Sequence, residues 1–248
     1  MLIRIINKLI EPAGFKIGKI ESVVPYDLVP ESKFMELYNK CKPFTMTSIE
    51  RMYSLYQSVN YVINNRIPGD FVECGVWKGG SSMLIALMLK EKQQNDRKIY
   101  MYDTFEGMSE PTEADKDVRG DAARELLNIQ NASDEDSIWC LSSLDEVKKN
   151  MATTGFDNIH FIKGKVEDTL LNYLPEKISL LRLDTDWYES TKVEMEKLYP
   201  LLENKGVLLI DDFGHWEGAK KAILEYFSER SLNPLLHRID DTARIMIK

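Results

Sequence analysis

The sequence predicts an α/β fold in which a mostly parallel sheet carries helices on both faces. Short apolar runs alternate with helical stretches after residue 69, and these runs are almost continuously apolar rather than alternating with polar residues. Strands that are buried on both faces have this composition, and parallel strands need helical crossovers between them. The last fifteen residues differ, because they contain strand-like runs without a helix.

The elements follow one another in a regular order. Strand-like runs are DFVECG, KIYMYDTF, NIHFIKG, ISLLRLDTD and GVLLIDDF, and the helical stretches between them include SSMLIALMLKEK, VEDTLLNYL and YESTKVEMEKLYPLL. The ending PLLHRIDDTARIMIK predicts two short strands around Asp240 and Asp241, which form an antiparallel hairpin that closes the sheet.

Helices are predicted before the first strand, over residues 34–66, because apolar side chains there recur at intervals of three and four until Pro68 and Gly69. We expect a domain over residues 34–248 and an N-terminal appendage over residues 1–33. The start, MLIRIINKLI, has apolar residues at helical spacing. A helix that packs on its own domain is expected there, with partner docking or a membrane surface as alternatives.

Composition excludes several classes of protein. The 248 residues include 32 Lys and Arg against 40 Asp and Glu, a formal charge of −8. No basic stripe is available for nucleic acid, and no run approaches the roughly 18 apolar residues of a transmembrane segment. Because the three cysteines, Cys41, Cys74 and Cys140, are widely spaced and odd in number, we expect buried thiols and a cytoplasmic location.

One connection is much longer than the others. Residues 106–137 are strongly acidic and separate two predicted strands. Connections in α/β units are usually about two to six residues long, and longer ones are often lids over a site. Because ligands bind beyond the carboxyl ends of strands in open sheets, and this insertion begins at such an end, we expect it to be a substrate lid.

The run from Glu73 to Ser82, ECGVWKGGSS, links the first strand directly to a helix. Glycines in such a turn let a cofactor approach the backbone. A dinucleotide fingerprint needs a second glycine where Trp77 stands. The turn therefore favours a nucleoside without phosphates, such as S-adenosylmethionine, with its amino group at Glu73 and its carboxylate at the helix N-terminus. A purely structural turn is the alternative.

Two further acids are candidates for contacts to the nucleoside. Asp103 ends the second strand, where an acid commonly accepts hydrogen bonds from a ribose diol. A turn former or a helix cap is equally consistent with this position. Asp168, in GKVEDT, is a candidate for adenine contact or for helix capping.

Two pairs of aspartates end neighbouring strands. Asp184 and Asp186 stand at i and i+2, so strand alternation would point both the same way, and Asp211 and Asp212 end the next strand. Four adjacent carboxylates repel one another unless a cation lies between them. Oxygen ligands select a hard ion such as Mg²⁺. Either pair alone is explained by solvated acids, but both pairs beside a cofactor turn predict a metal site.

Of the three histidines, His215 stands just beyond the last pair of aspartates, where it can contact substrate or transfer a proton. A loop histidine without function is the alternative. We expect His160 and His237 to be structural.

Five segments together resemble the macrocin O-methyltransferase family of sugar-modifying enzymes. They are GDFVECGVWKGGSSM, YDTFEGM, LRLDTDWYEST, LIDDFGHWEGAKKAI and RIDDTARIMIK, and the resemblance covers about the last four-fifths of the chain. It implies a Rossmann-like class I methyltransferase fold with seven strands, mostly parallel, and an antiparallel C-terminal strand. It also implies methyl transfer from S-adenosylmethionine, dependent on Mg²⁺, to a sugar hydroxyl of a glycosylated natural product or polysaccharide. The sequence leaves the oligomeric state open, and a homo-oligomer through the N-terminal helices is one form that the resemblance suggests, since relatives commonly associate through such segments.

The resemblance also implies roles for particular residues. The proton acceptor falls on Asp186, with Asp184 as the alternative, and we assign His215 and Tyr188 to the acceptor substrate. The metal ligands are Asp184, Asp211 and Asp212. The cofactor contacts are Thr45, Met46, Glu73, Cys74, Gly75, Val76, Trp77, Tyr102, Asp103, Thr104 and Phe105, to which the sequence reading adds Asp168.

Two other functions stay open at the level of sequence. A metal-dependent O-methyltransferase for a small catechol or phenol would need a flat apolar gate, whereas the acidic insertion favours a hydroxyl-rich acceptor. A noncatalytic binding subunit would keep the fold without the chemistry. The intact aspartates Asp184, Asp186, Asp211 and Asp212 argue against that loss.

Overall fold

The computed structural model describes residues 24–131 and 137–248. The chain divides into two compact units, Met1–Met35 and Glu36–Lys248. The helix predicted within the first ten residues lies outside the described residues. Across the described ranges, no helix combines the length and the apolar character that crossing a membrane requires.

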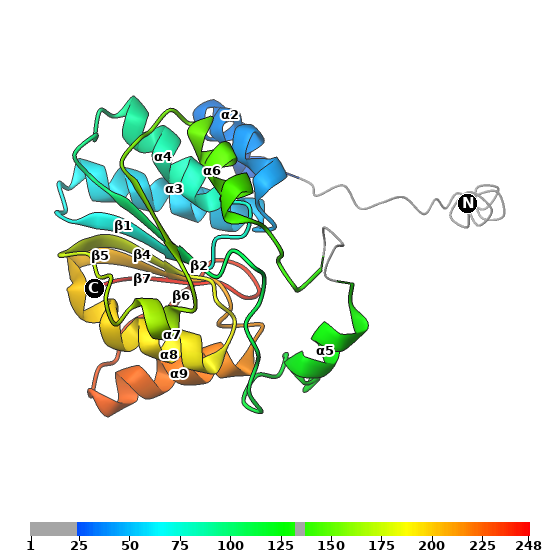
Figure 1. Cartoon of the computed structure of the whole chain (residues 1–248). Helices are drawn as coiled ribbons and strands as arrows, with labels where there is room; N and C mark the ends of the chain where they lie inside the picture. The colour runs from blue at the N-terminus through cyan, green and yellow to red at the C-terminus, as the bar shows by residue number, and fades with distance from the viewer. Residues whose placement is uncertain (1–23, 132–136) are drawn as a thin grey trace, which may run out of the picture. The chain divides into compact units, whose positions relative to one another are not determined.

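In the described residues, seven strands form one sheet in the order β3-β2-β1-β4-β5-β7-β6 (Figure 1). Strands β1 to β5 run parallel, whereas β7 is antiparallel to β5 and β6 is antiparallel to β7. The predicted fold class, including the C-terminal hairpin, is therefore confirmed. The strands are β1 (Asp70–Cys74), β2 (Ile99–Asp103), β3 (Ile159–Lys163), β4 (Ile178–Leu183), β5 (Leu202–Ile210), β6 (His237–Arg238) and β7 (Arg244–Ile247).

Helices cover both faces of this sheet (Figure 1). One face carries α3 (Ile49–Asn64), α4 (Gly80–Glu91) and α6 (Leu144–Ala152), and the other carries α7 (Val166–Thr169), α8 (Tyr188–Lys197) and α9 (Glu217–Glu229). The remaining helical elements are η2 (Tyr26–Leu28), α2 (Ser32–Cys41), η3 (Lys42–Phe44), α5 (Ala123–Ile129) and η4 (Tyr199–Leu201).

The strand order reverses between β1 and β4. The chain proceeds from β1 outward to β3, then returns to place β4 on the other side of β1. Helices leave the two strands toward opposite faces, so a crevice opens at the carboxyl ends where the order reverses. The topology therefore places a ligand site at the tips of β1 and β4.

The central strands are apolar because both faces of the sheet are covered. All six residues of β4 are buried, and most of α4 is buried as well, as expected for a helix that is apolar on all sides. Arg182 is the exception within β4, a charged side chain that is buried among leucines. A buried charge needs partners, and these partners define the site described below.

The insertion after β2 is attached to the rest of the domain along its described part. The Asp115 carboxylate is fully buried and accepts a hydrogen bond from the N–H of Tyr188 at 2.7 Å. The Trp187 indole donates to the carbonyl of Ser109 at 3.0 Å. Trp187 packs with Trp216 and with Leu127 of α5 in one apolar cluster. The described part of the insertion is thus anchored to the starts of α8 and α9.

Candidate active site

A cavity of about 370 Å³ lies at the carboxyl ends of β1, β2, β4 and β5. Most of the residues predicted for the site line it. Those predicted for the cofactor are Thr45, Met46, Glu73, Gly75, Val76, Trp77, Tyr102, Asp103 and Thr104. Those predicted for the chemistry and the acceptor are Asp184, Asp186, Asp211, Asp212 and His215.

Four predicted residues are not among those that line this cavity. Cys74 is fully buried, and the Phe105 ring packs near Phe161. The Tyr188 hydroxyl donates to Glu225 of α9 at 2.7 Å, so this side chain faces a helix rather than the acceptor. Asp168 is exposed in α7, where it neither lines the cavity nor caps the helix; its neighbour Glu167 lines the cavity instead.

The turn after β1 depends on a glycine. Gly75 has a φ of 80°, and a Cβ atom there would lie 1.8 Å from the carbonyl oxygen of Asp184. Only glycine fits both the left-handed backbone and this close approach. The Asp103 carboxylate holds the same turn, because it accepts from the N–H groups of Val76 at 2.6 Å and Trp77 at 3.2 Å.

Asp103 also supports the turn that follows β2, since it accepts from the N–H of Phe105 at 2.6 Å. Burial raises the pKa of Asp103, and the backbone donors oppose that shift. Asp103, for which a ribose contact is predicted, thus already accepts hydrogen bonds from three backbone N–H groups. The contact to ribose stays a prediction. The observed role of Asp103 is to connect the turn after β1 with the turn after β2.

The Glu73 carboxylate is 1% exposed and lies at the same end of the sheet. It accepts hydrogen bonds from the Ser82 hydroxyl of α4 and from Arg182. Burial raises the pKa of Glu73, whereas the Arg182 charge and the Ser82 hydroxyl lower it.

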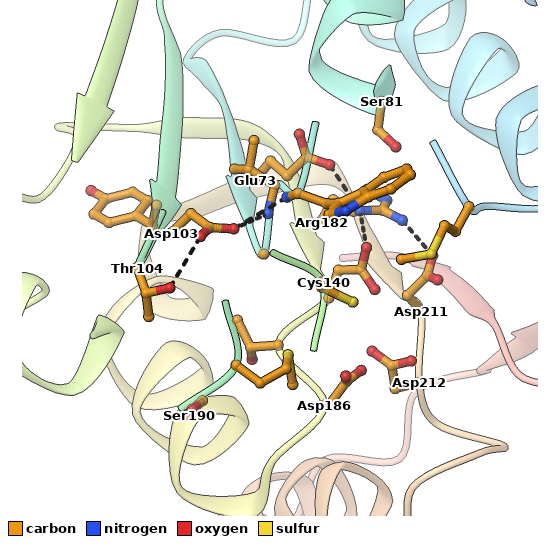
Figure 2. A pocket seen from close by; sticks show the side chains of 18 of the residues that line it. Glu73, Ser81, Asp103, Thr104, Cys140, Arg182, Asp186, Ser190, Asp211 and Asp212 are labelled. Atoms are coloured by element: carbon orange, nitrogen blue, oxygen red, sulfur yellow. Dashed lines mark hydrogen bonds and ion pairs between the residues drawn. The ribbon is translucent and has the colours of Figure 1, made fainter. Parts of the chain in front are cut away.

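Arg182 occupies the centre of the site (Figure 2). Its Nη1 donates to Glu73 at 2.8 Å and to Asp184 at 2.6 Å, and its Nη2 donates to Asp211 at 2.7 Å. The side chain is 4% exposed, and these three carboxylates raise the pKa of the guanidinium well above its ordinary value despite burial. Arg182 therefore neutralises part of the negative charge of the predicted acids.

A second arginine joins α3 to the C-terminal hairpin. Arg51, in the first turn of α3, pairs with Asp211 and Asp240 and donates to the Thr242 hydroxyl. The N-cap Ser48 accepts from the Arg51 N–H at 3.2 Å and donates to Asp240 at 2.8 Å. Asp240 thus fastens the hairpin to α3.

We expect Asp240→Asn to lower the free energy of unfolding by about 2 kcal/mol at neutral pH. Burial would raise the pKa of Asp240, but the Ala243 N–H and Arg51 lower it from 3.8 to about 2. The carboxylate therefore stabilises the fold above about pH 4, and this contribution disappears as the pH falls to 2. Urea unfolding of wild type and variant at both pH values measures the difference.

Asp241→Asn is the matched control for this prediction. Asp241 adjoins Asp240, and its side chain is 95% exposed and pairs with Arg238 on the surface. Such pairs contribute little, typically below about 1 kcal/mol. An Asp240 effect that is no larger than the Asp241 effect, or that is the same at pH 2, would contradict the assigned pairing.

Three carboxylates remain close enough together to hold a metal ion. One oxygen from each of Asp184, Asp186 and Asp212 lies within 4.8 Å of the others, and the Asp186 and Asp212 side chains point toward one another (Figure 2). Neither Asp186 nor Asp212 has an ion-pair partner in the part of the chain that the structure describes. Asp212 Oδ2 is buried without a hydrogen-bond partner.

Burial and mutual repulsion act on these acids in the same direction. Burial raises the pKa of Asp186 to about 7; hydrogen bonding with Asp212 opposes this shift, whereas the charges of Asp184 and Asp211 add to it. Burial, followed by the charges of Asp186 and Asp211, raises the pKa of Asp212. A cation among these carboxylates would reduce both the cost of burying their charges and their mutual repulsion. The set of oxygen donors therefore fits a hard divalent ion.

The set differs from the predicted ligands at one position. Asp211 was predicted as a ligand, but its two oxygens accept from Arg182 and Arg51, while Asp186 stands with Asp184 and Asp212. The strand β4 also ends at Leu183, and Asp186 has a φ of 69°. Strand alternation therefore does not bring Asp184 and Asp186 together; the left-handed turn after β4 does.

The remaining wall of the cavity comes from the insertion and from the loop after β5. Met108, Ser109 and Ile138 line it from the insertion side. His215 is half-buried, and its ring meets Trp216 edge to face at a centroid distance of 4.8 Å. Burial lowers the pKa of His215 below 6.5, so the imidazole is mainly neutral at pH 7.

The sequence reading missed several residues that line the cavity. The most important are Arg182 and Arg51, followed by Glu167 and Cys140. An arginine inside the apolar run ISLLRL was a usable signal, because a buried strand does not tolerate an unpaired charge. Arg51 carried no such signal, because it stands on an amphipathic helix among other polar residues.

Comparisons with known proteins agree with this geometry. The model of the macrocin-O-methyltransferase family matches residues 40–248. Demethyldecarbamoylnovobiocin O-methyltransferase of Streptomyces niveus is 31% identical over 198 residues, which are 79% of this chain and 72% of that protein. Mycinamicin III 3''-O-methyltransferase of Micromonospora griseorubida is 29% identical over 79% of this chain and 75% of that protein.

Solved structures show the same fold. The O-methyltransferase NovP superposes with a TM-score of 0.70 at 27% identity, over 83% of this chain and 82% of its own. The calicheamicin methyltransferase CalS11 superposes with a TM-score of 0.60 at 15% identity, over 94% and 98% of the two chains. At that identity the second likeness concerns the fold alone.

Proposed function

This chain belongs to the macrocin-O-methyltransferase family and is an O-methyltransferase, and we propose that it methylates a sugar hydroxyl of a glycosylated small molecule or polysaccharide, with S-adenosylmethionine as donor. The family and the reaction class predicted from the five motifs are confirmed. The observation that carries the finer proposal is one cavity that contains both the glycine turn after β1 and the carboxylates Asp184, Asp186 and Asp212.

The donor fits the part of the cavity around β1 and β2. S-adenosylmethionine supplies a methyl group that its sulfonium already activates. Glu73 offers a buried carboxylate for the amino group of the donor, and α4 begins just beyond the turn and favours a carboxylate at its N-terminus. Gly75 lines the cavity, and its positive φ sets the path of the turn that would meet the donor.

The carboxylates fit Mg²⁺ as the resident ion, held by Asp184 and Asp212 and completed by Asp186 or Asp211. The partnerless Oδ2 of Asp212 and the purely oxygen donor set support this assignment. Mg²⁺ held there supplies Lewis acidity, which makes a hydroxyl easier to deprotonate. Asp184 and Asp212 would then position the acceptor oxygen beside the donor.

We assign the proton transfer to Asp186. Its carboxylate lines the cavity and has no ion-pair partner among the described residues. A carboxylate that lacks a cationic partner can accept a proton from an acceptor hydroxyl within hydrogen-bond reach. His215, neutral at pH 7, lies on the same wall and can orient the sugar by hydrogen bonding.

The class of acceptor is proposed from the relatives and from the cavity walls. Relatives of this chain are named as O-methyltransferases of demethyldecarbamoylnovobiocin, of mycinamicin III and, in Streptomyces olivaceus, of a rhamnosyl tetracenomycin C. In this chain the lining from the insertion and from the loop after β5 mixes Ser109, His215 and Met108 with Trp216, rather than presenting only aromatic surfaces. Hydroxyl and imidazole groups suit a hydroxyl-rich acceptor better than a flat catechol.

We also propose that the insertion limits the access of water to the cavity. Its described part contributes Met108, Ser109 and Ile138 to the wall. A closed wall helps methyl transfer because the acceptor oxygen must replace water in front of the methyl group.

Methyl transfer to glycosides tests the proposal directly. Purified protein is incubated with labelled S-adenosylmethionine, Mg²⁺ and matched pairs of a glycoside and its aglycone, with catechol as a third acceptor. We expect label in the glycosides alone. Label in catechol alone would support the phenol alternative, and calorimetry that detects no S-adenosylmethionine binding would indicate a noncatalytic subunit.

A further inference from the structure

The Arg182 guanidinium bridges the two halves of the cavity. It contacts Glu73 on the donor side and Asp184 on the carboxylate side through the same nitrogen, Nη1, at 2.8 and 2.6 Å. Its other terminal nitrogen, Nη2, contacts Asp211 at 2.7 Å and the Thr47 hydroxyl at 3.1 Å. Figure 2 shows Arg182 between Glu73 and Asp211.

The sheet brings these partners together from three adjacent strands. Glu73 and Arg182 are register partners on β1 and β4, while Asp184 and Asp211 directly follow β4 and β5. Thr47 belongs to the segment before α3, which also lines the cavity. A single side chain is therefore connected to the ends of β1, β4 and β5 and to the segment before α3.

The other side-chain contacts of the described residues do not duplicate the link between the carboxylates of Glu73 and Asp184. Ser82 reaches Glu73 only, and Arg51 reaches Asp211 but neither Glu73 nor Asp184. Within the described residues, Arg182 is the one ion-pair partner of Asp184. The ladder between β1 and β4 holds the two backbones, since the Asp184 N–H donates to the Cys74 carbonyl at 2.9 Å. Among the described residues, the Arg182 guanidinium is what links the carboxylates of Glu73 and Asp184 to each other.

We propose that Arg182 is a positioning residue. It holds the carboxylate of Glu73, which would contact the methyl donor, and the carboxylate of Asp184, which would contact the metal, in one fixed arrangement, and so aligns methyl donor and acceptor. The guanidinium suits this role because its planar fork offers five N–H donors in fixed directions. A lysine ammonium keeps the charge but is a single point that cannot span three carboxylates from the same position. The inference rests on the proposed function.

The test compares Arg182→Lys with Arg97→Lys. Arg97 is a partly buried arginine at the opposite end of the same sheet, where it donates to the carbonyls of Ile67 at 2.7 Å and Gly69 at 2.9 Å. The control therefore reports what losing a structural guanidinium does to the fold. Calorimetry gives the Kd of S-adenosylmethionine in EDTA and the Kd of Mn²⁺ alone, and thermal unfolding gives the stability of each variant.

We expect Arg182→Lys to weaken both ligands about tenfold or more and to lower kcat about a hundredfold, because small misplacements of reacting groups have effects of that order. Arg97→Lys should lower only the melting temperature. If Arg182→Lys does not fold, Thr47→Val loosens the guanidinium without exposing a charge, and it should weaken both ligands to a smaller extent.

The outcomes separate this inference from the proposed function. A wild-type protein that binds neither S-adenosylmethionine nor Mn²⁺ would overturn the proposed function, and the inference with it. The inference alone would be overturned if the wild type binds both ligands and the folded Arg182→Lys variant binds them as tightly as Arg97→Lys does. In that case Arg182 would be a purely structural residue. If Arg182→Lys does not fold, the same comparison is made with Thr47→Val.

Discussion

Asp186→Asn is expected to reduce methyl transfer by about 10²- to 10⁴-fold while the Kd of S-adenosylmethionine stays within about twofold. The amide has the size of the carboxylate but cannot accept the proton of the acceptor hydroxyl. Asp186 has no ion-pair partner among the described residues, so its replacement leaves no cation unpaired. Single-turnover methylation with a saturating donor measures the chemical step directly.

The control for this substitution is Asp145→Asn. Asp145 is exposed in the first turn of α6 and does not line the cavity. It should retain the wild-type rate. If Asp186→Asn also retained it, the base would be another group, and Asp184 would be the next candidate because it lines the same cavity.

Asp184→Asn and Asp212→Asn are each expected to abolish the dependence of the rate on Mg²⁺, with activity lower by about a hundredfold or more. Both acids belong to the three-carboxylate group, and Asp212 Oδ2 has no partner of its own. Removal of divalent ions by EDTA should inactivate the wild type to the same level. A wild-type rate that is unaffected by EDTA would contradict a metal role.

Asp211→Asn separates the two candidate ligand sets. If Asp211 binds the ion, as the family resemblance implies, the variant should weaken Mn²⁺ binding as strongly as Asp212→Asn does. If Asp211 instead serves Arg182 and Arg51, as its contacts indicate, the variant should mainly lower the melting temperature. Calorimetry with Mn²⁺ and thermal unfolding on the same samples distinguish these results.

The strands and the class of the fold followed from patterns within short segments. Each central strand is an apolar run, and β4 is buried along its whole length, so local composition was sufficient to locate it. The C-terminal hairpin around Asp240 was predicted for the same reason. The turn after β1 was recognisable because its glycines stand between a strand-like run and a helical stretch. The structure adds that Gly75 has a left-handed backbone that lies against Asp184.

Details of the site were harder to predict. Tyr188 follows the aspartate motif closely, yet its ring faces α9, because α8 begins there and points the side chain toward Glu225. Asp186 was expected to continue a strand, but the strand ends at Leu183. In both cases the local pattern gave the neighbourhood of the residue and not the direction of its side chain.

The sequence by itself determined the fold class, the family and the set of acids that gather at the strand ends, because hydrophobic pattern and motif spacing are local properties of the chain. Only the tertiary structure decided how these acids are compensated. Glu73 and Arg182 are 109 residues apart, and Arg51 and Asp211 are 160 residues apart. A buried carboxylate is stabilised by whichever cation the fold brings beside it, and that neighbour is fixed by packing across the whole domain.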